Sequence, residues 1–495
     1  MLMSILASFG LAFVSSLIRP GSNIVVRETS PRRGAPTDTG LWFVVGLTEK
    51  GAAGVAHKIE SMSDYVRVLG NRVTYGMLYD SLETFFAEGG STAYVSRVVG
   101  PAAVNSFRVV NDAGAAATLR VEALGPGAWG DSLQIAVLAG DLGGNFKLQV
   151  SHTTMGILET SPDLADKAAA FTWAANSQYI KLVDQPSPND PAVAAAAALA
   201  GGNDDRAAIT DAHWKTALGY FGKDLGPGQV SYPGRTTTQA HTDLQAHAIS
   251  RSCVALLDAV DTATAATHLT TAGQSRTVNA RYSALFAGWL ITPGVTPGTT
   301  RVIPPSAAVA GKIARQDSLG SANVPAAGQQ GELVYAIGIN SPILESDREK
   351  LNDAGVNVIR MMYGVARIYG WRSLANPVTE TQWLNFGNVR LLMEIASLAD
   401  NIGEAFMFNQ IDGQGSTINR FGAALTAMLM PYWEEGALYG DTAGDAFIVD
   451  IGPQVNTPTT IADGQLRAVL GLKMSPFAEM VTIEIVKIPI TEEVS

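Results

Sequence analysis

Continuous apolar runs that alternate with helical patterns constrain this chain more than any other feature of its sequence. The run "LWFVVGL" at 41–47 is apolar throughout, as expected of a parallel strand buried on both faces. "TYGMLYDSLETFFAEGG" at 74–90 repeats apolar residues at helical spacing and ends at two glycines, and "TAYVSRVV" at 92–99 reads as a second strand. This strand–helix–strand unit predicts an α/β domain with a parallel sheet.

The pattern changes between residues 101 and 200. Short runs such as "ATLRVEAL" and "NFKLQVSH" alternate apolar and polar residues and are separated by Gly, Asn and Asp, which predicts a small β-domain. The turn-like "GGNDD" at 201–205 marks its end. Buried-strand patterns then resume in "CVALLDAV", "ALFAGWLIT", "LVYAIGIN" and "VNVIRMMYG". A β-domain inserted into an α/β domain is the simplest account of this order.

A third pattern begins near Trp383. "NVRLLMEIASLADNI" and "STINRFGAALTAMLMPYWEEGALYG" predict two helices, and strand patterns follow up to "MVTIEIVKIPI" near the chain end. In that last run the apolar phase flips after Ile485, which predicts a bulge or a strand whose two ends serve different sheets. The predicted organisation is an arm at 1–40, an α/β domain in two parts at 41–100 and 201–380, the inserted β-domain at 101–200, and an α+β C-terminal domain at 381–495.

Composition excludes some classes of function. Apolar residues make up 47% of the 495 residues and charged residues 16%, so long disordered stretches are not expected. The net charge is -11, with no basic run to neutralise a phosphate backbone, which argues against nucleic acid as a partner. The single cysteine, Cys253, permits no intrachain disulfide and lies in a run that predicts a packed, buried thiol. Low charge and 50 glycines favour a protein that buries surface in an assembly.

The first eighteen residues carry no charged side chain and leave three interpretations open: a signal peptide, a membrane anchor or an amphipathic arm. A signal peptide has a positive region before its apolar core, but here the first basic residues, Arg19 and Arg27, follow the apolar run. A membrane span needs ~20 mostly apolar residues, and serines and a glycine interrupt this one. Apolar residues do recur at helical spacing, which fits the arm; they are Leu2, Leu6, Phe9, Phe13 and Leu17.

Candidate catalytic and metal-binding motifs are weak. Asp38-Thr39-Gly40 spells the aspartic-protease tripeptide, but such enzymes need two carboxylates and no second copy occurs. His241, Asp243 and His247 lack a further spaced ligand, so solvated residues on a helix are the prediction there. "GGNDD" is too short for a calcium loop. No G-x-S-x-G and no phosphate-binding loop is present. The sequence therefore predicts no catalytic site, no metal and no cofactor.

The order of the motifs resembles that of tail sheath proteins of contractile phage tails and related contractile injection machines. The similar pieces cover nearly the whole chain from residue 19 onward, in the family's order; they are "RPGSNIVVRETS", "TYGMLYDSLETFFAEGGSTAYVSRVVG", "PGAWGDSLQIAV", "LAGGNDD", "VIPPSAAVAGKIARQDSLGSANVPAA", "LNDAGVNVIR", "IYGWRSL", "LNFGNVRLLMEIASL", "PYWEEGALYG" and "GQLRAVLGLKMSPFAEMVTIEIV". Two pieces depart from the family pattern: Ser22-Asn23-Ile24 stands where Val-Tyr is frequent, and "GWRSL" replaces GARTL. Residues 1–18 have no counterpart, and the context of an assembly subunit favours an extra arm for them.

The resemblance implies a non-enzymatic structural subunit of a virion, assembled in the host cytoplasm. It implies a subtilisin-like central domain, helical self-assembly as hexameric rings around an inner tail tube, contacts with baseplate and tail terminator proteins, and neither nucleic-acid binding nor membrane anchoring. Two terminal strands would pair with neighbouring subunits and complete their C-terminal sheets. The residues of these strands are Ile24, Val25, Val26, Arg27, Val481, Ile483, Ile485, Val486 and Ile488.

A secreted subtilisin-fold hydrolase is the rival interpretation. Such an enzyme needs Ser, His and Asp in fixed geometry, yet none of the six histidines precedes Gly-Thr and no G-T-S-M-A serine is present. One further prediction concerns Arg315 and Asp317 in "GKIARQD", which we expect to lie together after Pro304-Pro305. They would serve structural hydrogen bonding or a lattice contact, and an exposed ion pair worth under ~1 kcal/mol is the alternative.

Overall fold

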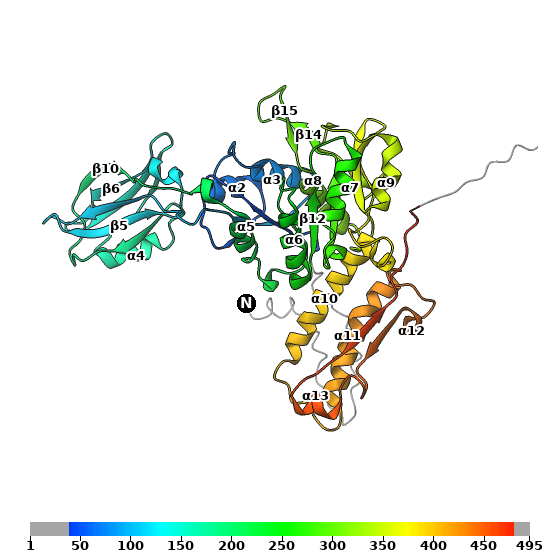
Figure 1. Cartoon of the computed structure of the whole chain (residues 1–495). Helices are drawn as coiled ribbons and strands as arrows, with labels where there is room; N and C mark the ends of the chain where they lie inside the picture. The colour runs from blue at the N-terminus through cyan, green and yellow to red at the C-terminus, as the bar shows by residue number, and fades with distance from the viewer. Residues whose placement is uncertain (1–38, 480–495) are drawn as a thin grey trace, which may run out of the picture. The chain divides into compact units, whose positions relative to one another are not determined.

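The computed structural model describes residues 39–479 (Figure 1). The predicted arm strands at residues 24–27 and 481–488 lie outside the described residues. Within the described part, the chain folds into α/β and β elements with several hydrophobic cores, so the predicted α/β class is confirmed. None of the helices in residues 39–479 combines the length and the apolar character needed to cross a bilayer.

A nine-stranded sheet forms the centre of the fold. Its order is β16 (Glu332–Leu333), β19 (Val365–Tyr369), β18 (Val356–Met362), β13 (Ser283–Ala287), β12 (Val254–Asp258), β11 (Gln229–Ser231), β1 (Trp42–Gly46), β3 (Ala93–Arg97) and β2 (Ala56–Ile59). The strands from β18 to β3 are parallel to their neighbours, and the edge strands β2, β19 and β16 are antiparallel. Every residue of β1, β12 and β13 is buried, as continuous apolar runs predict.

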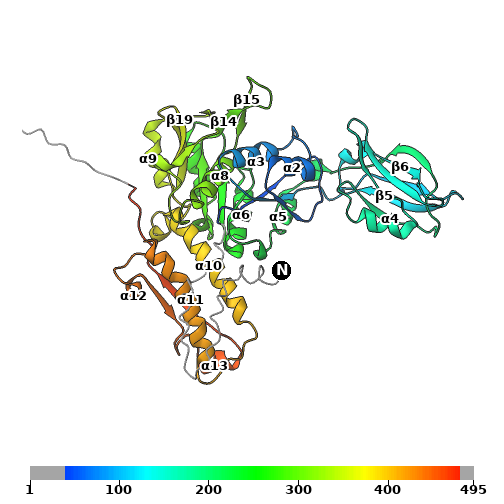
Figure 2. The same cartoon turned by 180° about the vertical axis from the view of Figure 1, so that it is seen from behind.

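Helices cover both faces of this sheet (Figures 1 and 2). Trp42 and Val44 of β1 face one hydrophobic core, and Phe43 and Val45 face the other, because successive strand residues point to opposite sides. The first core includes α2 (Met62–Leu69), α3 (Leu78–Ala87), α8 (Pro305–Asp317) and the start of α10 (Phe386–Phe406). The second includes α5 (Asp211–Leu218), α6 (Thr238–Arg251), α7 (Ala265–Gln274) and α9 (Arg348–Asp353).

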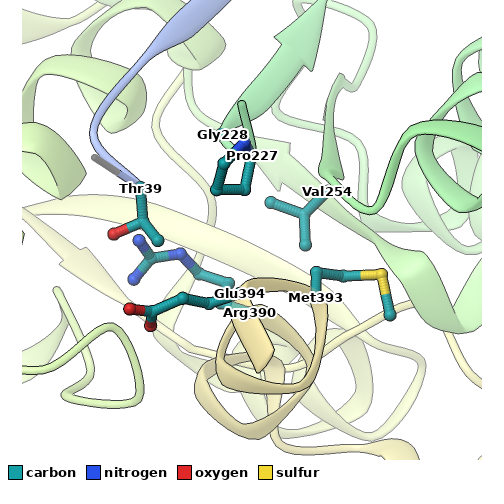
Figure 3. A pocket seen from close by; sticks show the side chains of 7 residues that line it. All are labelled: Thr39, Pro227, Gly228, Val254, Arg390, Met393 and Glu394. Atoms are coloured by element: carbon teal, nitrogen blue, oxygen red, sulfur yellow. The ribbon is translucent and has the colours of Figure 1, made fainter. Parts of the chain in front are cut away.

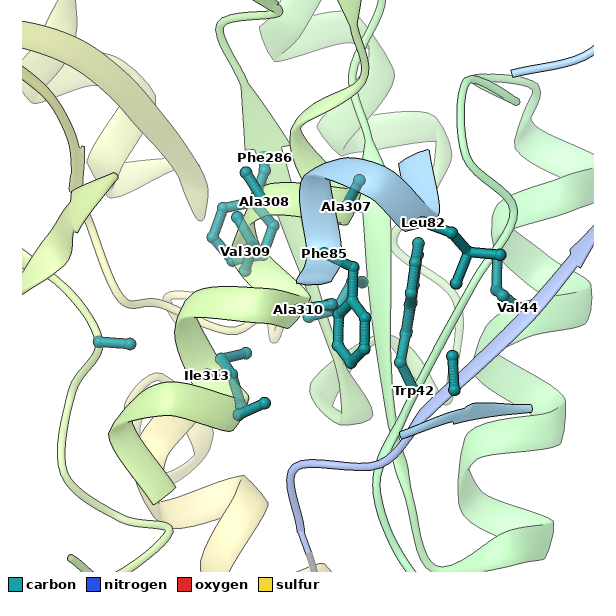
Figure 4. Close-up of a cluster of buried hydrophobic side chains, with 14 of the residues drawn as sticks. Trp42, Val44, Leu82, Phe85, Phe286, Ala307, Ala308, Val309, Ala310 and Ile313 are labelled. Atoms are coloured by element: carbon teal, nitrogen blue, oxygen red, sulfur yellow. The ribbon is translucent and has the colours of Figure 1, made fainter. Parts of the chain in front are cut away.

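Close packing of α3 on α8 explains why α8 is rich in alanine and glycine. In Figure 4 the Phe85 ring lies beside Trp42, with centroids 5.0 Å apart, while α8 passes next to them. A Cβ atom at Gly311 of α8 would lie 2.5 Å from the Phe85 carbonyl oxygen, so only glycine fits there. Small residues thus allow the two helices to approach, and the aromatic pair fills the space against the sheet.

Residues 107–198, between β3 and β11, form two small antiparallel sheets around a hydrophobic core of their own. One sheet contains β4 (Phe107–Asn111), β5 (Ala117–Ala123) and β9 (Ile180–Asp184). The other contains β10 (Ala194–Ala198), β6 (Leu133–Ala139), β7 (Phe146–His152) and β8 (Gly156–Thr160), and α4 (Lys167–Ala174) packs near them. These elements fall within the range predicted for the inserted β-domain.

Two predicted buried strands are wrong in detail. "ALFAGWLIT" breaks at Gly288, where φ is +99°, so β13 enters the large sheet and β14 (Leu290–Pro293) joins a separate sheet with β15 (Thr300–Ile303) and β17 (Gly338–Ile339). "LVYAIGIN" is not one strand either: its start lies in β16 and its end in β17. Val334 between them is 61% exposed, so the apolar run does not indicate burial here.

The C-terminal region is built on two long helices. α10 and α11 (Ser416–Glu434) pack side by side, followed by α12 (Ala443–Ala446), β20 (Phe447–Asp450), α13 (Pro458–Ala462) and β21 (Val469–Leu472) (Figures 1 and 2). Leu391 and Ile395 of α10 join a small core with Leu429 and Leu438. Because Phe386 and Met393 of the same helix belong to the central core, α10 connects the two regions.

Candidate functional site

Two buried polar residues, Ser306 and Asp258, are hydrogen-bonded at the start of α8. Ser306, in the first turn of α8, is fully buried and donates its hydroxyl to Asp258 Oδ2 at 2.8 Å. The backbone N–H groups of Ser306 and Gly234 also donate to the Asp258 carboxylate, at 2.7 and 2.9 Å. Burial raises the pKa of Asp258 to about 6. A buried serine that is bonded to a buried aspartate, with no histidine side chain as its base, does not form a catalytic triad.

The prediction of solvated residues is wrong for His241 and Asp243, which are buried, while His247 is partly buried. His241 is fully buried, with Nδ1 2.7 Å from Ser275 Oγ and Nε2 3.1 Å from the Asp258 carbonyl oxygen. Burial lowers the pKa of His241 and that of His247 to about 4, so both rings are neutral at pH 7. Asp243 is 5% exposed. The polar residues of this helix gave no indication in the sequence that neighbouring elements cover much of it.

Metal chemistry has no support in residues 39–479, which contain no group of three or more His, Cys, Asp or Glu able to hold an ion. Cys253 is buried, as predicted, and burial raises the pKa of its thiol to about 12. A thiol with this pKa is not a nucleophile at neutral pH. The features that remain are the contacts at two points, Thr39 and Glu479.

The first point lies at Thr39 and forms what we call the N-terminal root. Thr39 Oγ1 donates to Asp317 Oδ2 at 2.6 Å, and Arg390 of α10 donates to the same oxygen. The Arg390 and Asp317 side chains are only 2% and 7% exposed. Arg390 also donates to the Ala322 carbonyl at 2.7 Å. Figure 3 shows Thr39 facing Arg390 and Glu394 across a small pocket. Thr39 thus has a structural bond, whereas Asp38, the carboxylate of the aspartic-protease tripeptide, lies outside the described residues.

Arg315 and Asp317 both lie at the end of α8, but they bind different partners. Arg315 Nη2 donates to the Glu332 carbonyl at 2.7 Å and lies 3.6 Å from the Glu88 carboxylate. Glu88 accepts the Val334 and Tyr335 N–H groups at 2.9 and 2.8 Å, and burial raises the pKa of its carboxyl. These bonds of Arg315 and Asp317 lie within one subunit, and their lattice contact remains a prediction.

The second point lies at Glu479 and forms the C-terminal root. Arg372 donates to Glu479 Oε2 through Nη2 at 2.7 Å and through Nε at 3.1 Å. Arg372 is itself fixed, because its N–H donates to Asn357 Oδ1 at 2.7 Å and its Nη1 donates to the Asn352 carbonyl at 3.3 Å. This arginine belongs to "GWRSL", one of the pieces that departs from the family pattern. The sequence did not predict its partner.

Next to the long helices, β20 and β21 form a sheet of only two strands. They pair from Phe447 with Leu472 to Asp450 with Val469. Ile448 and Val469 are 62% and 55% exposed. Among residues 39–479 no further strand joins this sheet, apart from one bridge between Leu438 and Met474 beyond the end of β21. A two-stranded sheet is marginal by itself, and unpaired edges with apolar side chains invite another strand.

Comparison with known proteins identifies the class to which these features correspond. Residues 207–374 match the model of the phage tail sheath protein central domain. The fold resembles that of a sheath tail protein from Listeria innocua, at 13% identity and a TM-score of 0.63, over 84% of this chain and 89% of that one. It also resembles the contracted sheath of the anti-feeding prophage, at 15% identity and a TM-score of 0.55, over 96% and 99% of the two chains.

A third similar structure is the contracted sheath complex of the extracellular contractile injection system PVC, at 16% identity and a TM-score of 0.55, over 96% and 98% of the chains. No curated protein matches the sequence. At these identities the structural comparisons show a shared fold, whereas the family model matches the sequence itself. The resemblance to tail sheath proteins predicted from the motifs is therefore confirmed, and it points to a structural, non-enzymatic role.

Proposed function

We propose that this chain is the subunit of a contractile tail sheath that polymerises helically, as hexameric rings, around an inner tail tube. Its contraction would drive the tube through the host envelope. The observation that carries the proposal is the match of residues 207–374 to a sheath central domain, together with a fold shared over 96% of the chain with contracted sheaths. The subtilisin-like topology that the family resemblance implies would fit this role, because function lives in sites and not in folds.

Strand exchange is the proposed means of assembly. Residues 24–27 and 481–488 of neighbouring subunits would pair with the free edges of β20 and β21. The exposed Ile448 and Val469 support this, since within residues 39–479 each of the two strands pairs on one side only. Roughly six backbone hydrogen bonds at ~1 kcal/mol net each would make each arm a tether of several kcal/mol. Such tethers would hold while subunits rotate against one another.

Contraction then follows from a metastable lattice. The extended sheath would have small contacts between subunits, and the contracted sheath would have larger ones and a lower free energy. The energy would be stored during assembly, so no nucleotide hydrolysis is needed. The further partners under this proposal are the inner tail tube, the baseplate and the tail terminator, and the sheath would assemble in the host cytoplasm and remain in the virion.

Electron microscopy of the purified chain tests the proposal. We expect helical tubes or polysheaths whose formation depends on protein concentration. Dispersed monomers at all concentrations would contradict it. A serine-directed fluorophosphonate probe addresses the rival hydrolase: we expect no labelling, because Ser306 is buried and bonded to Asp258, and stoichiometric labelling of one serine would favour the enzyme.

A further inference from the structure

The N-terminal root and the C-terminal root are joined by a continuous series of bonds. At one end, Thr39 donates to Asp317 at 2.6 Å, and Asp317 is paired with Arg390. At the other end, Arg372 holds Glu479 at 2.7 Å. Arg390 lies near the start of α10, and Arg372 lies on the segment that is paired with that start. Thr39 and Glu479 therefore depend on the same short piece of structure.

The start of α10 provides the link between the arginines. The Phe386 N–H donates to the Trp371 carbonyl at 3.1 Å, and the Ser373 N–H donates to the Leu384 carbonyl at 2.8 Å. These bonds flank a bridge between Arg372 and Asn385, and Asn385 caps the helix by accepting the Asn388 N–H at 3.2 Å. Segment 371–373 is thus paired to the residues that begin α10.

Packing makes this link stiff. The Trp371 and Phe386 rings lie 5.4 Å apart and belong to the central core. Gly387 passes so close to the backbone that an added Cβ would lie 2.2 Å from the Asn323 carbonyl oxygen. Arg390 is 2% exposed and is fixed by Asp317 and by the Ala322 carbonyl. Buried charged pairs with several hydrogen bonds hold one geometry, because breaking them leaves an uncompensated charge.

We propose that the first two turns of α10, together with segment 371–373, form a node that couples the roots of the two arms. The proposal rests on the proposed function, because it takes the chain to leave Thr39 and Glu479 toward neighbouring subunits. Asp317, Arg390 and Arg372 are then positioning residues. A displacement at one root is passed through α10 to the other root, while the nine-stranded sheet keeps its shape. The arms of one subunit therefore respond together when the lattice rearranges.

A nitroxide label at Ala478, adjacent to Glu479, tests the coupling in the full-length subunit. Ala478 is exposed, and the only native cysteine is buried, so Ala478→Cys is labelled selectively. We expect Glu479→Gln to increase the mobile fraction of the label several-fold by removing the local ion pair. We expect Asp317→Asn, at the opposite root, to increase it by a similar factor, and Thr39→Val by a smaller one.

Matched substitutions at exposed positions serve as controls. Glu434→Gln and Thr459→Val change the same chemical groups on the C-terminal helices and should leave the label as in the parent protein. The node is contradicted when Glu479→Gln frees the label and neither Asp317→Asn nor Thr39→Val does. Should Asp317→Asn fail to fold by circular dichroism, Thr39→Val decides, because it removes one hydrogen bond and no charge.

A double-mutant cycle measured on assembled tubes distinguishes this proposal from the proposed function. We expect Thr39→Val and Glu479→Gln to shift the urea midpoint of tube disassembly non-additively, although the two residues share no bond partner. Additive shifts would contradict the node. If the parent protein forms no tubes, the sheath function is contradicted, while the label on the single subunit still decides whether the two roots are coupled.

Discussion

The central sheet and the β20–β21 sheet differ in how the edges of their strands are paired. The central sheet has nine strands, helices on both faces and antiparallel strands at its two edges. The C-terminal sheet has two strands and exposes Ile448 and Val469. Within residues 39–479, the first sheet ends in antiparallel edge strands, whereas each strand of the second pairs on one side only. Under the proposed function, a subunit of this kind would exchange strands at the second sheet without unfolding its central core.

Removal of the arms should have the largest effect on this contrast. We expect chains that lack residues 1–28, or that end at Glu479, to remain folded and soluble but to form no tubes, because the core residues within 39–479 pack against one another. Thermal melting followed by circular dichroism and electron microscopy measure the two properties. A truncated chain that still builds a normal sheath would exclude strand exchange, and one that fails to fold would place the termini in their own domain.

A pair of substitutions sharpens the comparison of the two sheets. Phe85→Ala removes a fully buried ring that packs on Trp42, and should lower the free energy of unfolding by ~3–5 kcal/mol. Ile448→Ala changes a side chain that is 62% exposed and should cost under ~0.5 kcal/mol in the monomer. Urea unfolding of the subunit gives both values. In tubes the order should reverse, with Ile448→Ala lowering the disassembly midpoint more; equal midpoints would argue that β20 is not an interface.

Protonation of His247 at low pH should weaken the central region. Burial lowers the pKa of His247 to about 4 from an ordinary 6.5. The unfolded chain binds a proton at His247 as the pH falls below 6.5, whereas the folded chain does so only near pH 4. The free energy of unfolding is therefore highest above pH 6.5 and falls by up to ~3 kcal/mol as the pH drops to 4. Asp258, with its pKa raised to about 6, acts in the opposite direction, so a variant must isolate the histidine. His247→Phe should reduce the dependence of unfolding free energy on pH, and an unchanged slope would show that His247 is protonated when folded.

The effect of Arg315 should be limited to one ion pair and one hydrogen bond. Its side chain is 27% exposed, but the Glu88 carboxylate 3.6 Å away is buried, so Arg315→Ala should lower the free energy of unfolding of the subunit by about 1–3 kcal/mol. The predicted lattice contact adds a second expectation, namely a lower disassembly midpoint for tubes than this loss explains. Urea titrations of subunit and tube compare the two, and equal shifts would remove Arg315 from the lattice.

The α/β core was predictable from sequence because its strands are buried on both faces and their apolar runs are continuous. "LWFVVGL" and "CVALLDAV" became β1 and β12 for this reason. "LVYAIGIN" failed because an apolar run by itself does not report burial, and Val334 lies exposed between two short strands. The prediction for helix α6 was wrong in the opposite sense: His241 and Asp243 are polar, but elements distant in sequence bury them.

The roots were not predictable for a related reason. Asp317 lies 278 positions from its partner Thr39 and 73 positions from its partner Arg390. No local sequence pattern predicts hydrogen bonds between residues so far apart. The motif "GKIARQD" did indicate that Asp317 mattered, but not that its partner would be α10. Arg372 was visible only as a departure from the family pattern. Family resemblance placed these residues in a functional context, and the tertiary structure supplied their partners.

A cryo-electron microscopy reconstruction of assembled tubes tests the central claim most directly, because it shows which chain lies along each edge of β20 and β21. The account predicts strands 24–27 and 481–488 from neighbouring subunits on these edges, with Thr39 and Glu479 still held at their roots. Edges that remain open, or that are filled by the subunit's own termini, would contradict it.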